Sequence, residues 1–122
     1  MKNVWYVFLG GGIGSVLRYV LFLLIPSTVF PFATFAVNIA GSFLIGLLAA
    51  LYGMNTSMQN SHQALILFLA TGLCGGFTTF STFSKESFGL MQQQQWGLFF
   101  VYVFLSVTLC IGGTALGFYV GK

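Results

Sequence analysis

No charged side chain occurs between Arg18 and Lys85, and within that stretch lies the segment 32–52, FATFAVNIAGSFLIGLLAALY. A helix needs about 20 apolar residues to cross the hydrocarbon core of a bilayer. The same pattern continues outward from this segment, because the 122-residue chain is 57% hydrophobic and only 4% charged. Soluble globular domains carry about a quarter charged residues. The composition therefore predicts an integral membrane protein.

Four apolar segments follow one another, separated by prolines and polar residues. The predicted spans cover residues 4–25, 32–52, 63–90 and 96–120. A polar run that ends before Gln63 is the only long loop expected, and residues 92–95 are predicted to form a short turn. Alternating ten-residue segments, which membrane barrels need, do not occur. The predicted fold class is an all-α membrane protein with one four-helix transmembrane domain over residues 1–122.

The few polar groups exclude several classes of function. Four basic residues give a net charge of +3 but are scattered along the chain, so they form no basic patch that could bind nucleic acid. The only acid, Glu86, and the only histidine, His62, cannot form a catalytic carboxylate pair or a zinc-type cluster. Ser-His-Asp catalysis requires an Asp, which this sequence lacks. We therefore expect a protein that is not an enzyme, with Cys74 and Cys110 as reduced thiols in apolar segments.

The charges leave the orientation in the membrane open. An even number of spans places Lys2 and Lys122 on one side, while Arg18 and Lys85 lie nearer the other. If all four count, the positive-inside rule gives no preference, and the chain could insert both ways and pair head to tail. If Arg18 and Lys85 do not count because they lie inside helices, a weak preference for cytoplasmic termini remains.

Polar side chains repeat every four residues in two of the spans, so each set shares one helix face. Asn38 is the most polar of them and lies near the middle of the second span. Its amide either joins helices by hydrogen bonds or donates N–H to a passing anion. The repeats comprise Thr34, Asn38 and Ser42 in the second span, and Tyr102, Ser106 and Cys110 in the fourth.

The third span carries the longest polar face. Its residues follow one another at helical spacing from mid-membrane to one surface: Thr78, Ser81, Thr82, Lys85 and Glu86. Beside this face runs a phenylalanine stripe, at Phe77, Phe80 and Phe83. Such a stripe can be ordinary packing, or it can line a narrow dry pore in which the positive ring edges attract an anion.

Small residues also recur at helix-packing spacing, which lets helix backbones approach closely in lipid. The pairs and triplet are Gly10 and Gly14, Ser42 and Gly46, Gly72 and Gly76, and Gly113, Gly117 and Gly121. Residues 72–79, GLCGGFTT, are in addition poor helix formers, so a break in the third span is predicted there. Carbonyls freed at membrane depth can coordinate a cation. Since one subunit offers few such oxygens, a pair of subunits would complete the shell.

Three segments resemble the Fluc (CrcB) family of fluoride channels: 12–19, GIGSVLRY; 34–43, TFAVNIAGSF; and 75–86, GGFTTFSTFSKE. The resemblance covers all four spans, and the third segment is the most specific. It implies an antiparallel homodimer with two pores and a central structural sodium ion. The backbone carbonyls of Gly75 and Thr78 would bind that Na⁺.

The resemblance also implies an ion pathway. Phe80 and Phe83 would be its phenylalanines, and Asn38 its amide. Its polar track would contain Ser81, Thr82, Glu86, Tyr102 and Ser106. Arg18 matches an arginine of the aqueous vestibule. Cys110 departs from the pattern, because some relatives have a hydroxyl residue at that position.

The implied function is passive export of fluoride across a bacterial cytoplasmic (inner) membrane, which relieves fluoride toxicity. Fluoride ion, membrane lipid and a second copy of the chain are the expected partners. One alternative is a small proton-coupled multidrug exporter, which would need an isolated acid in the first span, where none occurs. Another is a non-conducting structural subunit, against which the polar stripes argue.

Overall fold

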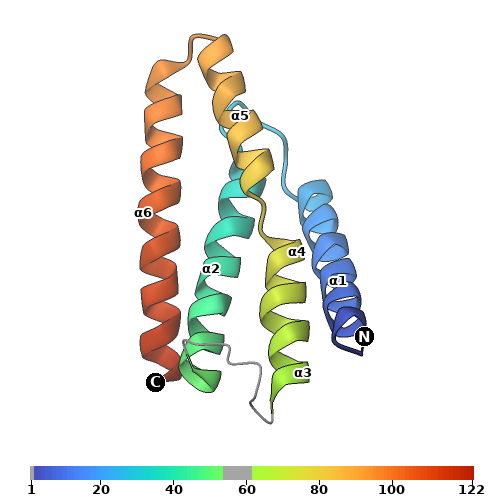
Figure 1. The fold of residues 1–122 in the computed structure, drawn as a ribbon. Coiled ribbons are helices and arrows are strands. Elements are labelled where there is room, and N and C mark those ends of the chain that lie inside the picture. Colours follow the sequence, from blue (N-terminus) through green and yellow to red (C-terminus); the bar gives the residue numbers. More distant parts are fainter. Residues whose placement is uncertain (1, 54–61) are drawn as a thin grey trace.

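The computed structural model describes residues 2–53 and 62–122. These residues form helices and no strand: α1 (Lys2–Leu24), α2 (Phe32–Tyr52), a third span over Gln63–Gln92, and α6 (Trp96–Gly121) (Figure 1). Each of the four is long and apolar enough to cross a membrane. The predicted all-helical, four-span fold is thus confirmed. Most of the predicted loop falls at 54–61, outside the described residues.

The third span is broken, as predicted, but at the end of the predicted region. It consists of α3 (Gln63–Ile66), η1 (Leu67–Cys74), α4 (Gly75–Phe77) and α5 (Phe80–Gln92). Between α4 and α5, Thr78 and Thr79 are extended, with φ/ψ of −83°/158° and −151°/112°. Gly75 and Gly76 remain helical, so weak helix propensity alone does not place the break.

The segment η1 is a π-helix, which the sequence analysis did not anticipate. A π-helix bonds each N–H five residues back and is usually confined to single turns near functional sites. Here it runs for 8 residues and is followed by the single turn of α4, which leads to the break. Thr71 and Gly72 lie within it, and both propagate an α-helix weakly. The widened helix brings Gly72 against Gly10 of α1, where an added Cβ would lie 2.9 Å from the Gly10 Cα atom.

Two helix pairs hold the chain together through glycines. α1 packs against η1 and α4, and α2 packs along α6. A Cβ at Gly14 would collide with the Leu73 carbonyl oxygen, and one at Gly117 with the Phe43 carbonyl oxygen. Backbones therefore touch directly at both interfaces, which is how helices associate where lipid removes the hydrophobic driving force. The predicted packing role of the small-residue stripes is confirmed.

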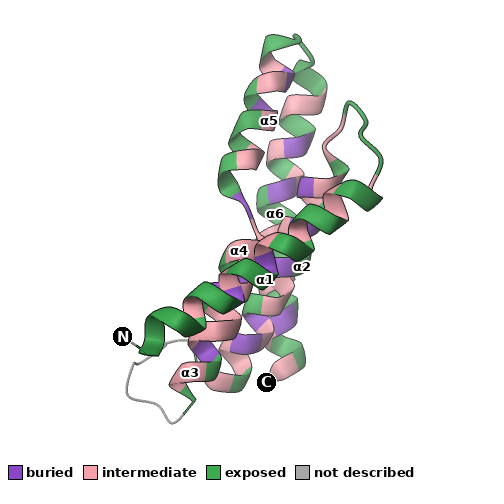
Figure 2. Ribbon diagram, turned by 90° about the vertical axis from the view of Figure 1, so that its right-hand side faces the viewer, coloured by how far each residue is buried: buried purple, intermediate pink, exposed green. Residues whose placement is uncertain are grey.

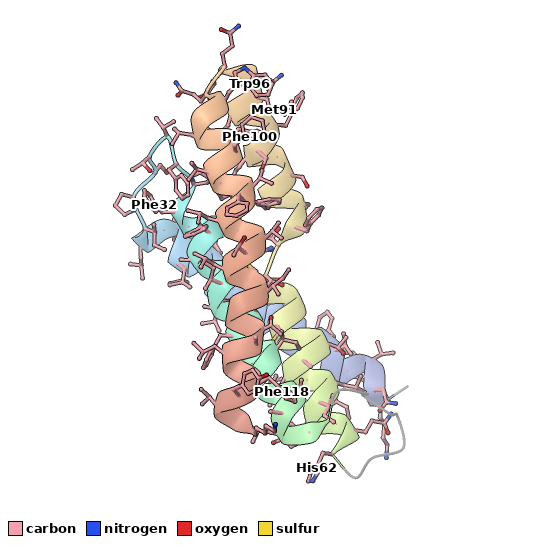
Figure 3. All side chains as sticks on the ribbon, turned by 90° about the vertical axis from the view of Figure 1, so that its left-hand side faces the viewer. Phe32, His62, Met91, Trp96, Phe100 and Phe118 are labelled. Atoms are coloured by element: carbon pink, nitrogen blue, oxygen red, sulfur yellow. The ribbon has the colours of Figure 1, made fainter. Side chains whose placement is uncertain are left out.

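Beyond these pairs, many large apolar side chains of the described helices are exposed. α5 packs mainly on the first half of α6, and the pair extends away from α1 (Figure 1). Figure 2 shows exposed residues along much of α1. Trp96 and His62 lie at opposite ends of the molecule (Figure 3). Apolar exposure over the length of membrane-spanning helices is what lipid, or another subunit, covers.

Candidate functional site

In the part of the chain that the structure describes, the Asn38 side chain of α2 makes two hydrogen bonds to the broken third span. The Thr79 backbone N–H donates to Asn38 Oδ1 at 2.8 Å, and Asn38 Nδ2 donates to the Thr79 carbonyl oxygen at 3.2 Å. A backbone N–H can only donate, so this pair of bonds fixes which way the amide faces. One Nδ2–H and one lone pair of Oδ1 remain for other partners.

The two hydrogen bonds to Asn38 change how α4 ends. The last helical hydrogen bond before the break runs from the Thr78 N–H to the Cys74 carbonyl oxygen at 3.0 Å. The next N–H, that of Thr79, would continue the ladder to the Gly75 carbonyl but donates to Asn38 instead. Gly75 therefore presents a carbonyl without its α-helical donor, and Thr78 adds another in the extended segment.

Thr79 also begins α5. Its Oγ1 accepts from the Thr82 N–H at 3.2 Å and donates to Thr82 Oγ1 at 3.0 Å, and Ser81 Oγ lies 3.4 Å away. This is helix N-capping, which satisfies one of the free N–H groups of the first turn. No sequence pattern predicted a role for Thr79. A threonine directly before the Phe80–Glu86 periodicity was the signal that could have identified it.

A cavity of about 430 Å³ opens beside the break, and four of the nine predicted pathway residues meet there. α2 contributes Asn38, the third span contributes both phenylalanines, and α6 contributes Ser106. The full lining is Asn38, Gly41, Ser42, Ile45, Ala70, Cys74, Gly75, Thr78, Thr79, Phe80, Phe83, Ser106, Val107 and Cys110. We call this space the break cavity.

Ser106 brings a buried hydroxyl without a partner to the break cavity. Its side chain is 5% exposed, and its Oγ has no hydrogen-bond partner among the described residues. A buried hydroxyl without a partner costs free energy, so such a group usually serves a ligand or a water. Phe80, by contrast, is 77% exposed, so its ring forms an open edge of the site.

A second cavity, of about 750 Å³, lies under the α1–α2 connection. Thr34, Lys85, Glu86 and Gln93 are polar residues of its lining, and residues 25–31, which include Ser27 and Thr28, form its roof. We call this space the connection cavity. Glu86 Oε1 accepts from the Tyr102 hydroxyl at 3.4 Å. The buried Thr34 hydroxyl is near both groups from α2 but does not reach hydrogen-bond geometry with either.

Tyr102 separates the two cavities. It is fully buried, and its ring centroid lies 5.1 Å from that of Phe83 and 5.4 Å from that of Phe30. Phe83 borders the break cavity and Glu86 borders the connection cavity. The aromatic ring of Tyr102, whose hydroxyl donates to Glu86, therefore lies between two cavities that both contain hydrogen-bond donors.

The helical spacing used in the sequence analysis fails across the break. Phe77 lies in α4 and packs near Gly41, so the phenylalanine stripe consists of Phe80 and Phe83 alone, with ring centroids 5.6 Å apart. Thr78 likewise leaves the polar face, and its hydroxyl donates to the Cys74 carbonyl at 2.9 Å. Periodicity predicts a shared face only within one continuous helix.

The remaining predicted residues are placed less centrally. Thr82 is held by Thr79, while Ser81 is exposed. Arg18 is half-buried on α1 and lines neither cavity. Cys74 and Cys110 are free thiols, as expected, and both line the break cavity.

Comparison with known proteins gives the family. The family model described as "CrcB-like protein, Camphor Resistance (CrcB)" matches residues 5–118. The chain belongs to the Fluc (CrcB) family. This is a family of ion channels, so the chain is not an enzyme.

Three relatives of this CrcB-family chain show how far the similarity extends. A protein of Flavobacterium psychrophilum is 46% identical, with 100% of this chain and 98% of the relative covered. One of Phocaeicola vulgatus is 47% identical with both chains fully covered, and one of Shewanella denitrificans is 42% identical over 96% of this chain and 94% of the relative. Each is named "Fluoride-specific ion channel FluC".

Proposed function

We propose that this CrcB-family protein is a fluoride-selective channel that lets fluoride leave the cell passively across the cytoplasmic membrane. The relatives' names support the ion. One observation carries the proposal for the site: the break cavity combines a buried, unpaired Ser106 hydroxyl with an Asn38 amide that retains one N–H. Both are hydrogen-bond donors at membrane depth, and no acid lines this cavity.

The chemistry of the proposed path suits a small anion. Fluoride is strongly hydrated, so entry requires donors that replace its water. Ser106 and Asn38 supply O–H and N–H, and the edges of Phe80 and Phe83 carry partial positive charge. The Glu86–Tyr102 pair and the Thr34, Ser81 and Thr82 hydroxyls continue the proposed track toward the connection cavity. An inside-negative potential drives an anion outward with about 2.3 kcal/mol per 100 mV. Such export would relieve fluoride toxicity without another energy source.

The proposed assembly is an antiparallel homodimer. The break cavity is open at Phe80 and carries polar groups that lipid cannot satisfy. A second copy would cover it. The even division of Lys2 and Lys122 against Arg18 and Lys85 supports insertion in both orientations. A tag on the C-terminus should then be accessible from both sides of the membrane, and accessibility from one side only would refute the antiparallel pairing.

A structural sodium ion is part of the same proposal. The residues fit it, because the Gly75 carbonyl lacks its helical donor and Thr78 is extended. Two subunits would bring four such oxygens. Glu86, the only acid of the sequence, does not line the break cavity that contains Gly75 and Thr78, so the site is neutral, which suits a monovalent cation better than a divalent one. Bound there, Na⁺ would offset the cost of an anion in a low-dielectric slab.

The deciding experiment is reconstitution of the purified protein in liposomes. Fluoride efflux should be fast and should exceed chloride efflux, and it should need no proton gradient. Proton-coupled transport of an organic cation would support a multidrug-type exporter instead. Absence of any flux from a folded, correctly inserted protein would indicate a structural subunit.

A further inference from the structure

Every polar group of Thr79 has a partner, although the residue lies in an irregular segment. Its N–H and C=O both bond Asn38, and its hydroxyl bonds the first turn of α5. The residue is 6% exposed. It therefore ties α2, the break and α5 together at one point.

This arrangement solves a problem that the membrane imposes. The N–H of an extended residue between two helices is used by neither helix, whereas its C=O, as that of an N-cap residue, accepts the first bond of the helix that follows; a backbone N–H without a partner is costly at membrane depth. The Asn38 amide pairs with both at once. The Thr79 hydroxyl then occupies the cap position, where Ser and Thr are favoured. Rotation of the Thr79 peptide would break bonds on both sides together.

The position of Thr79 in the chain makes this constraint matter for the site. Phe80 follows it directly, and Phe83 lies one helical turn later, against the buried ring of Tyr102. The direction in which α5 leaves the break therefore sets where both rings stand relative to Ser106 and Asn38.

We propose that Thr79 is a positioning residue for the anion path: its hydroxyl cap and its Asn38-held peptide together fix the start of α5, and thereby the placement of Phe80 and Phe83. This rests on the proposed channel function. It differs from a purely structural cap in one respect. A cap that only stabilises the helix changes how much protein folds, whereas a positioning residue changes which ions pass through the protein that does fold.

The experiment compares Thr79→Val with Thr79→Ser in purified, reconstituted protein. Valine keeps the shape of threonine and removes the hydroxyl, while serine keeps the hydroxyl. Thr108→Val is the matched control, because Thr108 lies exposed on α6 and lines neither cavity. Fluoride efflux, chloride efflux and the yield of folded dimer are measured for each. Thr79→Ala is made as well, so that a smaller variant without the hydroxyl is available if valine does not fold.

Loss of one buried hydrogen bond typically changes an equilibrium about tenfold. We therefore expect Thr79→Val, or Thr79→Ala in its place, to lower the fluoride-to-chloride flux ratio of folded protein by about that factor. Thr79→Ser and Thr108→Val should retain the ratio of the unmodified protein. The proposal is overturned if the hydroxyl-free variants keep the normal ratio, or if neither folds while Thr79→Ser does, since both results describe a structural cap only. Failure of the unmodified protein to conduct fluoride would instead refute the proposed function.

Discussion

The ring of Phe83 lies against that of Tyr102, with centroids 5.1 Å apart and planes inclined by 47°. This contact joins α5, which starts at the break, to α6, which carries the unpaired Ser106 hydroxyl. Tyr102 in turn donates to Glu86 at the second cavity. The aromatic pair thus couples the geometry of the break to both cavities, and any substitution that moves α5 must also move this pair of rings.

Replacement of the proposed pathway phenylalanines tests the aromatic part of the site. Phe80→Ile and Phe83→Ile should each lower fluoride efflux by about tenfold, near the upper range of an aromatic interaction. Phe80→Ile should leave the fold of a single subunit unchanged because the ring is 77% exposed there, whereas Phe83→Ile removes packing against Tyr102. Phe88→Ile is the control, since Phe88 is exposed on α5 and lines neither cavity. If both pathway variants conduct like the control, these rings serve packing alone.

Substitution of Asn38 separates donor chemistry from shape. Asn38→Asp keeps the oxygen that accepts from the Thr79 N–H but replaces the Nδ2 donor by an anionic oxygen facing the Thr79 carbonyl. It should therefore conduct less fluoride than Asn38→Ser, which loses the bonds without adding charge. Efflux from liposomes with equal amounts of folded protein makes the comparison. Equal or greater efflux through the Asp variant would contradict a donor role for the amide.

Chemical modification of Cys110 tests whether the break cavity is the path. Cys110 is half-buried and lines that cavity, so a small neutral thiol reagent such as methyl methanethiosulfonate should reach it and narrow the space. Fluoride efflux should then fall at least several-fold. Cys110→Ser should resist the reagent, and Cys74→Ser should remain sensitive because buried Cys74 is the less accessible thiol. Undiminished efflux after complete labelling of Cys110, verified by mass, places the path elsewhere.

The α2–α6 interface gives a prediction about stability alone. An alanine methyl at Gly117 would collide with the Phe43 carbonyl oxygen, whereas one at Gly112 meets nothing within 4 Å. Gly117→Ala should cost about 1–3 kcal/mol of folding free energy through overpacking. Gly112→Ala should be neutral or slightly stabilising, because alanine is the better helix former. Thermal unfolding in detergent compares the two. Equal melting temperatures of the two variants would mean that α2 and α6 can separate at Gly117 without a loss of stability.

Much of this fold follows from the sequence, because membrane spans depend on charge-free length and little else. The small-residue stripes likewise predicted contacts that the helices make, since only glycine permits backbone contact at such positions. The approach of Asn38 to the break cavity was also foreseeable, because a mid-membrane amide must find partners. The groups that Asn38 binds, the backbone N–H and C=O of Thr79, could not be predicted from the sequence.

The exact place of the break illustrates what local pattern cannot supply. Residues 72–79 were predicted as weak helix, yet Gly75 and Gly76 are helical and the chain opens at Thr78 and Thr79. Propensity differences between residues are at most about 1 kcal/mol, apart from proline. A pair of hydrogen bonds from another helix outweighs them, and no periodicity within the third span encodes that partner. The same reasoning applies to η1, whose π geometry accompanies close contact with α1.

The last prediction concerns the cation. The Thr79 N–H donates to Asn38, so the Gly75 carbonyl lacks a donor at membrane depth, where a cation would stabilise it. Thr78 offers a second carbonyl nearby in sequence. Replacing Na⁺ by N-methylglucamine on both sides should therefore weaken fluoride efflux, and returning Na⁺ should restore it. Asn38→Leu gives an independent check, because it frees the Thr79 N–H to bond the Gly75 carbonyl as in a regular helix. That variant should bind Na⁺ more weakly, measured by the Na⁺ concentration that protects the dimer from thermal unfolding, with Phe88→Ile as the control. Efflux and melting temperature that are both indifferent to Na⁺ would show that these carbonyls are satisfied by water or protein, and the sodium site would have to be abandoned.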